Sequence, residues 1–439
     1  MNDDVDEQTR SARLAIAAVL GAAALTAVIG WWGARLNAGG TRLFADAAPF
    51  HGQWRWLEEP GRFVPVFVAA LIVVVWPTLS ERVSWRWALV GSWITASVWT
   101  VSLAASAGWD RIWGPLTSRY EYLPLARRLD ELGGPGEFVR TFVERLPDFP
   151  THVRSHPPFP VLALWFLDRL GLDDPTIGWL TLLVSASAAP AAVIAFDRLA
   201  GRDLARRALM FAGLAPAAIW MSSADAVFMA LGAWSIAALA VAVTSQRPAV
   251  WRTAAVLAGL GAGLFAVSSY GAPTLMGPFV ALAVWSLWRR HWQPIAMATG
   301  VAVVPVAMFA ASGFWWFTGF EATRAEYWKG FARLRPYGYY AIANLAVTAA
   351  SIGPVAVGGL AFVRRNVTWL LVWGAIAGAI VATLSGYSKG EVERIWLPLT
   401  PFLGLAAAAV PGGLGARRAW LAAQLALGVG LSLLLGTPW

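Results

Sequence analysis

The chain has 439 residues, of which 58% are hydrophobic and 13% are charged, and it contains no cysteine. A soluble domain carries about 25% charged residues, so we expect a polytopic membrane protein. The lack of cysteine excludes a disulfide framework, a zinc knuckle and a cysteine nucleophile. The net charge of +9 does not indicate nucleic acid binding, because the arginines lie in pairs between apolar runs, as in cytoplasmic turns. Only Lys329 and Lys389 are lysines, which indicates a GC-rich genome such as that of an actinobacterium.

Thirteen apolar runs are long enough to be transmembrane helices, since roughly 20 apolar residues cross a bilayer. They lie near residues 12–31, 63–79, 86–106, 176–195, 207–221, 225–243, 253–270, 272–289, 294–317, 341–362, 368–385, 394–411 and 418–436. The first run follows MNDDVDEQTRSAR without a small-residue cleavage site, so we expect a retained span and not a signal peptide. The sequence therefore predicts an all-α fold with about 13 transmembrane helices and external juxtamembrane helices.

A further apolar segment, 157–172, is predicted to stay on the outer surface. If it does not cross the membrane, five arginine-bearing turns are all cytoplasmic, as the positive-inside rule requires. These turns are 196–207, 244–252, 289–293, 363–367 and 412–417. The segment is also short for a span and contains Asp168 and Arg169, which favours an interfacial helix.

With the amino terminus inside, we expect three regions and no separate soluble domain. They are an N-terminal transmembrane hairpin (1–85), a core (86–290) with a large external loop (107–175), and C-terminal transmembrane helices (291–439) with external segments 318–340 and 386–393. Together with the loop 32–62, these external segments hold most of the acidic residues. The chemistry is therefore predicted on the outer face of the cytoplasmic membrane.

Asp110 and Glu121 are the first two acidic residues of the longest external segment, which begins directly at the end of a span. A carboxylate at the membrane boundary, beside apolar walls that raise its basicity, could deprotonate a hydroxyl acceptor in a transferase. The alternative is that these acids form ordinary loop ion pairs with Arg111 and Arg119. Asp110 and Glu121 are the candidate catalytic residues.

The same segment continues into FPTHVRSHPPFP, where His152, Arg154 and His156 lie on a stretch stiffened by Pro157 and Pro158. Histidine can act as acid, base or ligand near neutral pH, and all three side chains could contact a phosphate or a hydroxyl group. The alternative is a proline-stiffened entry into the interfacial helix with solvated histidines. We expect these three residues to bind substrate.

A second candidate binding segment is GYSKGEVERIWLP, which places Tyr387, Lys389, Glu391, Glu393 and Arg394 where a span begins at the outer face. A cation at that depth can hold the phosphate of a lipid carrier through charge-assisted hydrogen bonds. Snorkelling of an interfacial arginine is the alternative.

Asp225 stands alone at the outer end of a predicted helix, where a carboxylate is costly unless it binds or caps something. The segment 318–340 combines cations with many aromatic rings, and it is expected either to face lipid headgroups or a sugar or to form an ordinary aromatic belt. Its cations are Arg324, Lys329, Arg333 and Arg335. The loop 32–62 offers Asp46, His51, Glu58 and Glu59 without a recognisable spacing.

The order of an acid-bearing loop, YEYLPLARRL, His-Pro-Pro, an interfacial helix and LAPAAIWMSSADAVF resembles the GT-C superfamily of integral-membrane glycosyltransferases. It is most similar to the branch with protein mannosyltransferases, aminoarabinose transferases and actinobacterial cell-wall mannosyl- and arabinosyltransferases. The resemblance implies a base in the first external loop, juxtamembrane helices after a Pro-Pro motif, and an Asp at an outer helix end. The matching positions are Asp110 or Glu121, His156 with Pro157 and Pro158, and Pro216 with Asp225.

The family often has an Asp-Glu pair shortly before the tyrosine of this loop, whereas Ser118 and Arg119 precede Tyr122 here. Either Asp110 or Glu121 then takes the place of the base. The resemblance predicts transfer of a sugar from a polyprenyl-phosphate carrier in the membrane lipid to a hydroxyl of a glycan, lipid or protein acceptor. No nucleotide-binding loop occurs, and no pattern demands a metal, although the sequence leaves a divalent ion open.

Two other functions fit parts of the sequence. A flippase or transporter of lipid-linked sugars predicts polar residues near the middle of several spans, and the runs contain almost none. A polymerase or ligase of polyprenyl-diphosphate glycans would use the same external residues. It differs in that its lipid donor carries a diphosphate and not a monophosphate.

Overall fold

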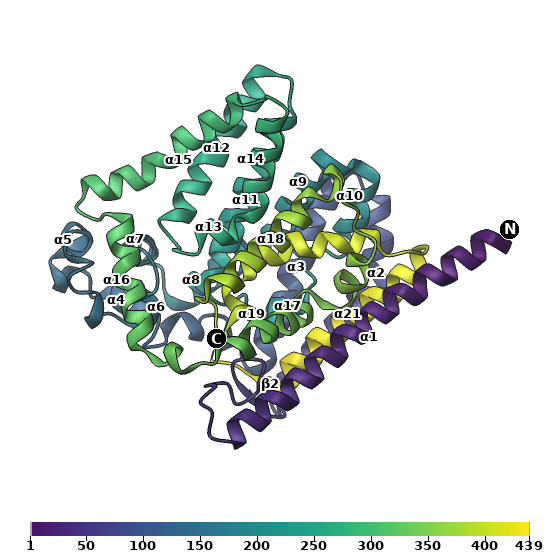
Figure 1. The fold of residues 1–439 in the computed structure, drawn as a ribbon, viewed down its shortest axis with the longest axis horizontal. Helices are drawn as coiled ribbons and strands as arrows, with labels where there is room; N and C mark the ends of the chain where they lie inside the picture. The colour runs from purple at the N-terminus through teal and green to yellow at the C-terminus, as the bar shows by residue number, and fades with distance from the viewer. Residues whose placement is uncertain (1, 439) are drawn as a thin grey trace.

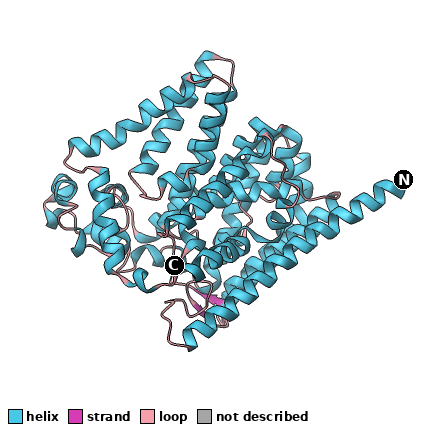
Figure 2. Cartoon of the chain, in the orientation of Figure 1, coloured by secondary structure: helices cyan, strands magenta, loops and turns pink. Residues whose placement is uncertain are grey.

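The computed structural model describes residues 2–438 and consists almost entirely of helices (Figure 2). The α-helices are α1 (Asn2–Ala38), α2 (Phe63–Arg82), α3 (Trp85–Ala104), α4 (Leu123–Arg127), α5 (Gly134–Thr141), α6 (Thr151–Arg154), α7 (Phe159–Arg169), α8 (Asp174–Ala186), α9 (Ala188–Ala200), α10 (Arg202–Leu209), α11 (Ala224–Thr244), α12 (Pro248–Ala266), α13 (Ala272–Leu275), α14 (Gly277–Trp288), α15 (Gln293–Ala311), α16 (Trp316–Lys329), α17 (Tyr337–Leu360), α18 (Leu370–Ser385), α19 (Val392–Ile395), α20 (Thr400–Gly404) and α21 (Leu414–Leu434).

Short 3₁₀ helices and one pair of strands complete the fold. The 3₁₀ helices are η1 (Pro60–Arg62), η2 (Ala105–Ala107), η3 (Trp109–Ile112), η4 (Gly114–Thr117), η5 (Asp130–Leu132), η6 (Leu146–Asp148), η7 (Pro216–Trp220), η8 (Phe331–Leu334), η9 (Val367–Trp369), η10 (Leu397–Leu399) and η11 (Leu405–Ala409). The strands β1 (Gln53–Trp54) and β2 (Leu435–Gly436) pair antiparallel and join the first loop to the end of the chain.

Within residues 2–438, nine helices are long and apolar enough to cross a membrane. They are Thr9–Ala38, Pro60–Arg82, Trp85–Ala107, Asp174–Ala200, Ala224–Thr244, Pro248–Ala266, Gln293–Ala311, Tyr337–Leu360 and Val367–Ser385. The all-α membrane character predicted from composition is confirmed, whereas the number of 13 spans is not.

Three of the other four predicted spans are broken into short pieces. The run 207–221 is α10 followed by a turn and η7, the run 272–289 is α13 and α14, and the run 394–411 is divided among α19, η10, α20 and η11. Prolines stand in the first turns of most of these pieces. Proline lacks an N–H and fixes φ, so it starts a helix readily and interrupts a longer one. The length of an apolar run in the sequence does not show whether such breaks interrupt the helix.

The last predicted span, 418–436, corresponds to α21, which is continuous over 21 residues. It contains Arg417, Arg418 and Gln424 and is not among the nine apolar helices. Gln424 is buried and stabilises α17. Its side-chain amide donates to the Ile352 carbonyl (2.8 Å) and accepts from the Val355 N–H (3.2 Å). These bonds satisfy backbone groups freed where α17 kinks at Pro354.

The basic turns and the long connecting segments lie at opposite ends of the helix bundle. At one end, Arg206 donates to the Ser80 carbonyl (2.8 Å) and Arg417 pairs with Glu81 (2.8 Å). At the other end, β1 pairs with β2 and Arg111 donates to the Thr437 carbonyl (3.1 Å). This two-ended arrangement is the one that the positive-inside rule predicts.

The segment 157–172 forms the 11-residue helix α7, which rises about 16 Å at 1.5 Å per residue. That is about half of the 30 Å hydrocarbon thickness, so α7 does not span a bilayer. It is held against the neighbouring short helices by ion pairs of Arg169 with Asp130 and of Arg127 with Asp168. Figure 1 shows α4, α5, α6, α7 and α16 gathered on one side of the molecule.

The N-terminal segment 2–85 packs on the C-terminal helices. Helix α1 runs along α17, where Trp32 meets the edge of Tyr339 with ring centroids 5.3 Å apart. Helix α2 packs on α3 and α21. The first loop is thereby placed next to the segments around residues 335 and 390, which positions one part of the site described below.

Candidate functional site

Charged side chains from five separate segments meet at the end of the bundle that carries the long connecting segments. We call this group the charged cluster; it consists of His51, Glu121, His152, Asp225, Arg335, Lys389, Glu391, Glu393 and Arg394. Most of these side chains are buried and the others are partly buried. Carboxylates and guanidinium groups are almost never fully buried unless they are paired, so the cluster is the strongest candidate for a site.

Arg394 and Asp225 form the centre of the cluster. They are 5% and 4% exposed and their side chains form an ion pair. Asp225 lies in the first turn of α11, where the helix dipole favours a carboxylate, and Arg394 lies in α19. A second carboxylate, Glu391, is 3.4 Å from Arg394. The lone carboxylate noted in the sequence is therefore matched by a cation that is 169 residues away.

Glu391 is held between two guanidinium groups by an unusual backbone conformation. Its φ of 60° is in the left-handed region, which costs a non-glycine residue about 1–2 kcal/mol. In this position its carboxylate is 3.2 Å from Arg335, which also donates to the Lys389 carbonyl (2.7 Å). Although burial alone raises it, the pKa of Glu391 is lowered to about 2 by Arg335, His51 and Arg394. Glu391 is thus an ionised carboxylate over the physiological range.

Glu393 is 1% exposed and has a different environment. One carboxylate oxygen accepts the backbone N–H of His51 (2.8 Å), and Oε2 has no partner among the described residues. Burial, assisted by the neighbouring Glu391 charge, raises the pKa of Glu393 to about 7. Burial also lowers the pKa of His51. Glu393, whose pKa lies near neutral pH, therefore stands beside a histidine whose neutral form is favoured by burial.

Glu121 and His152 form a hydrogen-bonded pair, with 2.6 Å between Oε1 and Nδ1. A neighbouring backbone hydrogen bond supports this contact. The His152 N–H donates to the Tyr120 carbonyl (3.0 Å) and thereby brings α6 beside the turn that precedes α4. The two side chains are 5% and 12% exposed, respectively, so the imidazole is the more accessible of the two. A carboxylate that accepts from Nδ1–H leaves the other imidazole nitrogen as the basic one.

Tyr122 and His156 pack beside this pair. The His156 Nδ1 is 3.0 Å from the Ser268 carbonyl, which can only accept, so Nδ1 carries the proton. Burial lowers the pKa of His156, which favours the neutral ring. The Tyr122 hydroxyl is buried and has no partner among the described residues, and burial raises its pKa well above the ordinary value. Tyr122 therefore offers a donor for a ligand oxygen.

Lys389 lies against aromatic rings from α16. Its ammonium is 4.7 Å from the Trp328 ring centroid and 6.0 Å from that of Tyr327, and the ring of Tyr387 packs on both aromatics. Among the described residues no carboxylate pairs with Lys389, so its charge is not neutralised by the cluster. Burial, with a contribution from Arg335, lowers its pKa.

Arg154 lies at the edge of the site, where its guanidinium is 3.8 Å from Glu326 and its carbonyl accepts from the Thr323 hydroxyl (2.9 Å). Both partners belong to α16, so this helix covers the cluster from one side. The aromatic segment identified in the sequence thus contributes directly to the walls of the site.

Asp110 lies apart from the cluster. It is an exposed residue of η3, at the end of α3, and η3 packs on η4 and α8. The sequence left the base open between Asp110 and Glu121, and the structure brings Glu121, and not Asp110, into the cluster.

Three cluster members, His51, Arg335 and Glu393, were noted in external segments of the sequence but were not selected as binding residues. His51 and Glu393 are 342 residues apart in sequence, and no spacing rule connects them. One signal was present, since this chain has only four histidines and three of them, His51, His152 and His156, lie in external segments.

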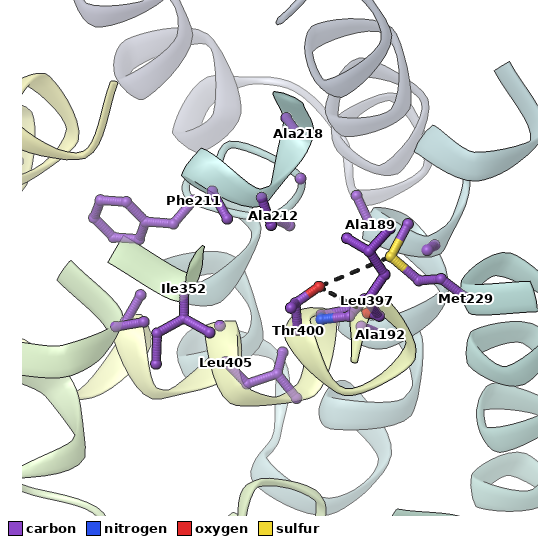
Figure 3. Close-up of a pocket in the computed structure, with 18 of the residues that line it drawn as sticks. Ala189, Ala192, Phe211, Ala212, Ala218, Met229, Ile352, Leu397, Thr400 and Leu405 are labelled. Carbon is purple, nitrogen blue, oxygen red and sulfur yellow. Dashed lines mark hydrogen bonds between the residues drawn. The ribbon is translucent and has the colours of Figure 1, made fainter. Parts of the chain in front are cut away.

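Two apolar spaces elsewhere in the bundle hold no charged group. One, of about 50 Å³, lies between α9, α11, α17 and α20 (Figure 3). Figure 3 shows Thr400 near Leu397 and Met229, and the hydroxyl of Thr400 donates to the Leu397 carbonyl (2.8 Å). The other, a groove of about 490 Å³, lies between α2, α3 and α8. Within residues 2–438, no group of three or more His, Asp or Glu side chains is arranged to hold a metal ion.

We find no match of this sequence to a family model or to a curated protein. The features of this molecule that bear on function are the charged cluster and its place at the end of an apolar bundle.

Proposed function

We propose that this protein is a GT-C-like membrane glycosyltransferase that moves a sugar from a polyprenyl-phosphate carrier to a hydroxyl acceptor on the outer face of the cytoplasmic membrane. The observation that carries the proposal is the charged cluster itself. It combines a carboxylate–imidazole pair with buried guanidinium groups and an ammonium, at one end of helices apolar enough to lie in lipid. Such a place suits a substrate with a hydrocarbon tail and an anionic head.

Glu121, paired with His152, is the carboxylate of the acid–base group in this proposal. A base must lie near the acceptor hydroxyl in a site that excludes water, and Glu121 is 4% exposed, whereas Asp110 is exposed to solvent. The charge of Glu121 interacts with that of Arg394, so a donor phosphate bound by Arg394 would lie near this carboxylate. The hydroxyl would attack the anomeric carbon while the carrier phosphate leaves with the bonding electrons.

The phosphate would be bound by the cations of the cluster. Lys389 has no carboxylate partner among the described residues, so its charge is available to an anion. Arg394 faces Asp225 and Glu391, and the longer contact, 3.4 Å to Glu391, is the one that a phosphate could replace. Tyr122 and Arg154 would add donors at the two sides of the cluster. Charge-assisted hydrogen bonds of this kind are about twice as strong as neutral ones.

The location of the buried charges favours a transferase over a flippase. A transporter needs polar groups near the middle of the membrane along its path. Here Gln424 is explained by its bonds to the kink in α17, and the apolar space in Figure 3 has no charged lining residue. The charges gather where the connecting segments meet, so substrates would react at that end without crossing.

A transfer assay tests the proposal. The purified protein in lipid nanodiscs is incubated with polyprenyl-phosphate mannose or polyprenyl-phosphate arabinose and a hydroxyl acceptor, and with a nucleotide sugar as a separate donor. We expect release of polyprenyl phosphate with the lipid-linked donors only. Turnover with the nucleotide sugar, or with a polyprenyl-diphosphate donor in place of the monophosphate, would contradict the proposal.

A further inference from the structure

We propose that His152, and not Glu121, takes the proton of the acceptor hydroxyl, and that Glu121 is the positioning residue that holds the imidazole. This assignment rests on the proposed function and names the atom that does the acid–base work within it. It starts from the 2.6 Å contact between the Glu121 Oε1 and the His152 Nδ1.

The tautomer follows from this contact. An ionised carboxylate only accepts hydrogen bonds, so the imidazole donates from Nδ1 and its lone pair lies on Nε2. Glu121 thus fixes both the orientation of the ring and which nitrogen is basic, in the way that a carboxylate supports a catalytic histidine. The backbone N–H of His152 donates to the Tyr120 carbonyl (3.0 Å), which also fixes the main chain that carries the ring.

The side chains of His152 and Glu121 differ in their exposure to solvent. The His152 side chain is 12% exposed and that of Glu121 is 5% exposed, so an entering hydroxyl reaches the ring before it reaches the carboxylate. Glu121 Oε1 is already occupied by Nδ1. Direct transfer to this oxygen would compete with its hydrogen bond to Nδ1, whereas transfer to Nε2 leaves the pair intact.

The charged groups around His152 come from several elements. Glu121 and Tyr122 directly precede α4, and His156 follows α6. The charge of Glu391 interacts with His152, and Glu391 contacts Arg394 of α19, which pairs with Asp225 of α11. Asp225 is paired with Arg394, Glu391 with Arg335 and Arg394, and Glu393 accepts the His51 N–H. Glu121 is the carboxylate in direct contact with the imidazole and would compensate its positive charge.

The step balances in atoms and charge. His152 Nε2 takes the hydroxyl proton, the acceptor oxygen bonds to the anomeric carbon, and the bond from that carbon to the phosphate oxygen breaks with its electron pair on the phosphate. The imidazolium is then stabilised by the Glu121 carboxylate, and the carrier phosphate has gained one negative charge. The proton passes from His152 to the phosphate or to water as the products leave.

Three variants test the assignment: His152→Gln, Glu121→Gln and, as a matched control at the opposite end of the bundle, His291→Gln. The His291 Nδ1 contacts the Val243 carbonyl (3.2 Å), away from the charged cluster. Transfer from polyprenyl-phosphate mannose is measured in nanodiscs, with thermal unfolding to verify folding. We expect His152→Gln to lower kcat by about 10²- to 10⁴-fold with KM for the donor within a few-fold, and His291→Gln to match the wild type.

A rescue experiment distinguishes a base from a merely structural side chain. In His152→Gly, added imidazole should restore turnover in a concentration-dependent way, whereas added formate should not. A folded His152→Gln variant with activity within a few-fold of the wild type, while Glu121→Gln is inactive, would overturn the assignment and return the proton to Glu121. Wild-type protein that transfers no sugar from any polyprenyl-phosphate donor would instead overturn the proposed function.

Discussion

Arg394 and Asp225 are 169 residues apart in sequence and form a buried ion pair at the centre of the charged cluster. The pair joins α19 to the first turn of α11, and through Glu391 it is connected to Arg335 and the first loop. Segments from the beginning, middle and end of the chain therefore depend on one guanidinium group for their charge balance. Loss of this guanidinium group should therefore destabilise the fold.

Removing one partner of the pair should destabilise the protein strongly. Arg394→Ala leaves Asp225 buried without its cation and removes one of the two guanidinium groups beside Glu391, and breaking a buried pair costs about 3–5 kcal/mol. The double variant Asp225→Leu with Arg394→Met should cost less than Arg394→Ala alone, because no unpaired charge remains at Asp225. Equilibrium unfolding in mixed micelles, followed by circular dichroism, measures both. Equal losses in the single and double variants would show that the ion pair does not govern stability here.

The two acids of the first external segment should behave differently. Glu121→Gln keeps the shape of the side chain and removes the charge that supports the acid–base pair, so transfer should fall by about 10²- to 10⁴-fold. Asp110→Asn is the matched control, since Asp110 is exposed and outside the cluster. Its activity should remain within a few-fold of the wild type. A larger loss in Asp110→Asn than in Glu121→Gln would place the base at the end of α3.

Binding of an anionic lipid should weaken as the pH rises through about 7, the pKa of Glu393. Below this pH the carboxyl is neutral, and above it an added negative charge repels the phosphate. We expect about a tenfold loss of affinity for farnesyl phosphate between pH 6 and pH 8, which corresponds to 1.4 kcal/mol. Glu393→Gln should bind with nearly constant affinity over this range. A wild-type affinity that does not change, or that rises with pH, would contradict the role given to Glu393.

The same carboxyl links stability to pH. Its folded-state pKa of about 7 is above the ordinary value of 4.5, so the folded protein keeps this proton when the unfolded chain loses it. The stabilising contribution is complete below pH 4.5 and is lost as the pH rises to about 7. Comparison of the wild type with Glu393→Gln isolates this contribution, because the amide does not ionise.

Tyr122→Phe should separate stability from ligand binding. A buried hydroxyl without a partner costs about 1–3 kcal/mol, so its removal should leave stability unchanged or raise it by about 1 kcal/mol. The same change should weaken donor binding, because the hydroxyl is a free donor inside the site. Tyr120→Phe is the control, since the Tyr120 hydroxyl is bonded to Arg119 at the surface. A Tyr122→Phe variant with reduced stability and unchanged affinity would refute this role.

The sequence predicted the helical membrane fold and the separation of the two ends because composition and charge bias act locally. Apolar runs and arginine pairs can be recognised without any knowledge of tertiary contacts. The broken helices between residues 392 and 409 were not predicted, since their apolar composition is that of a continuous span. Proline positions were the only local sign of these breaks.

The site was predicted in part. Glu121, His152, Asp225, Lys389, Glu391 and Arg394 were expected from their external positions, and the structure brings them together. Their partners could not be predicted, because Arg335 with Glu391 and His51 with Glu393 are contacts across 56 and 342 residues. Such contacts depend on how α1 packs along α17, for which no pattern in the sequence gives a signal.

Photochemical cross-linking tests the central claim, that the charged cluster binds a lipid phosphate. A polyprenyl phosphate with a photoreactive group on its first isoprene unit is bound to the protein in nanodiscs, irradiated, and mapped by mass spectrometry. We expect labelled peptides from residues 118–128, 150–158 and 386–394, and competition by unlabelled polyprenyl phosphate. Labelling confined to the groove between α2, α3 and α8, or to the arginine-rich end of the bundle, would contradict the account.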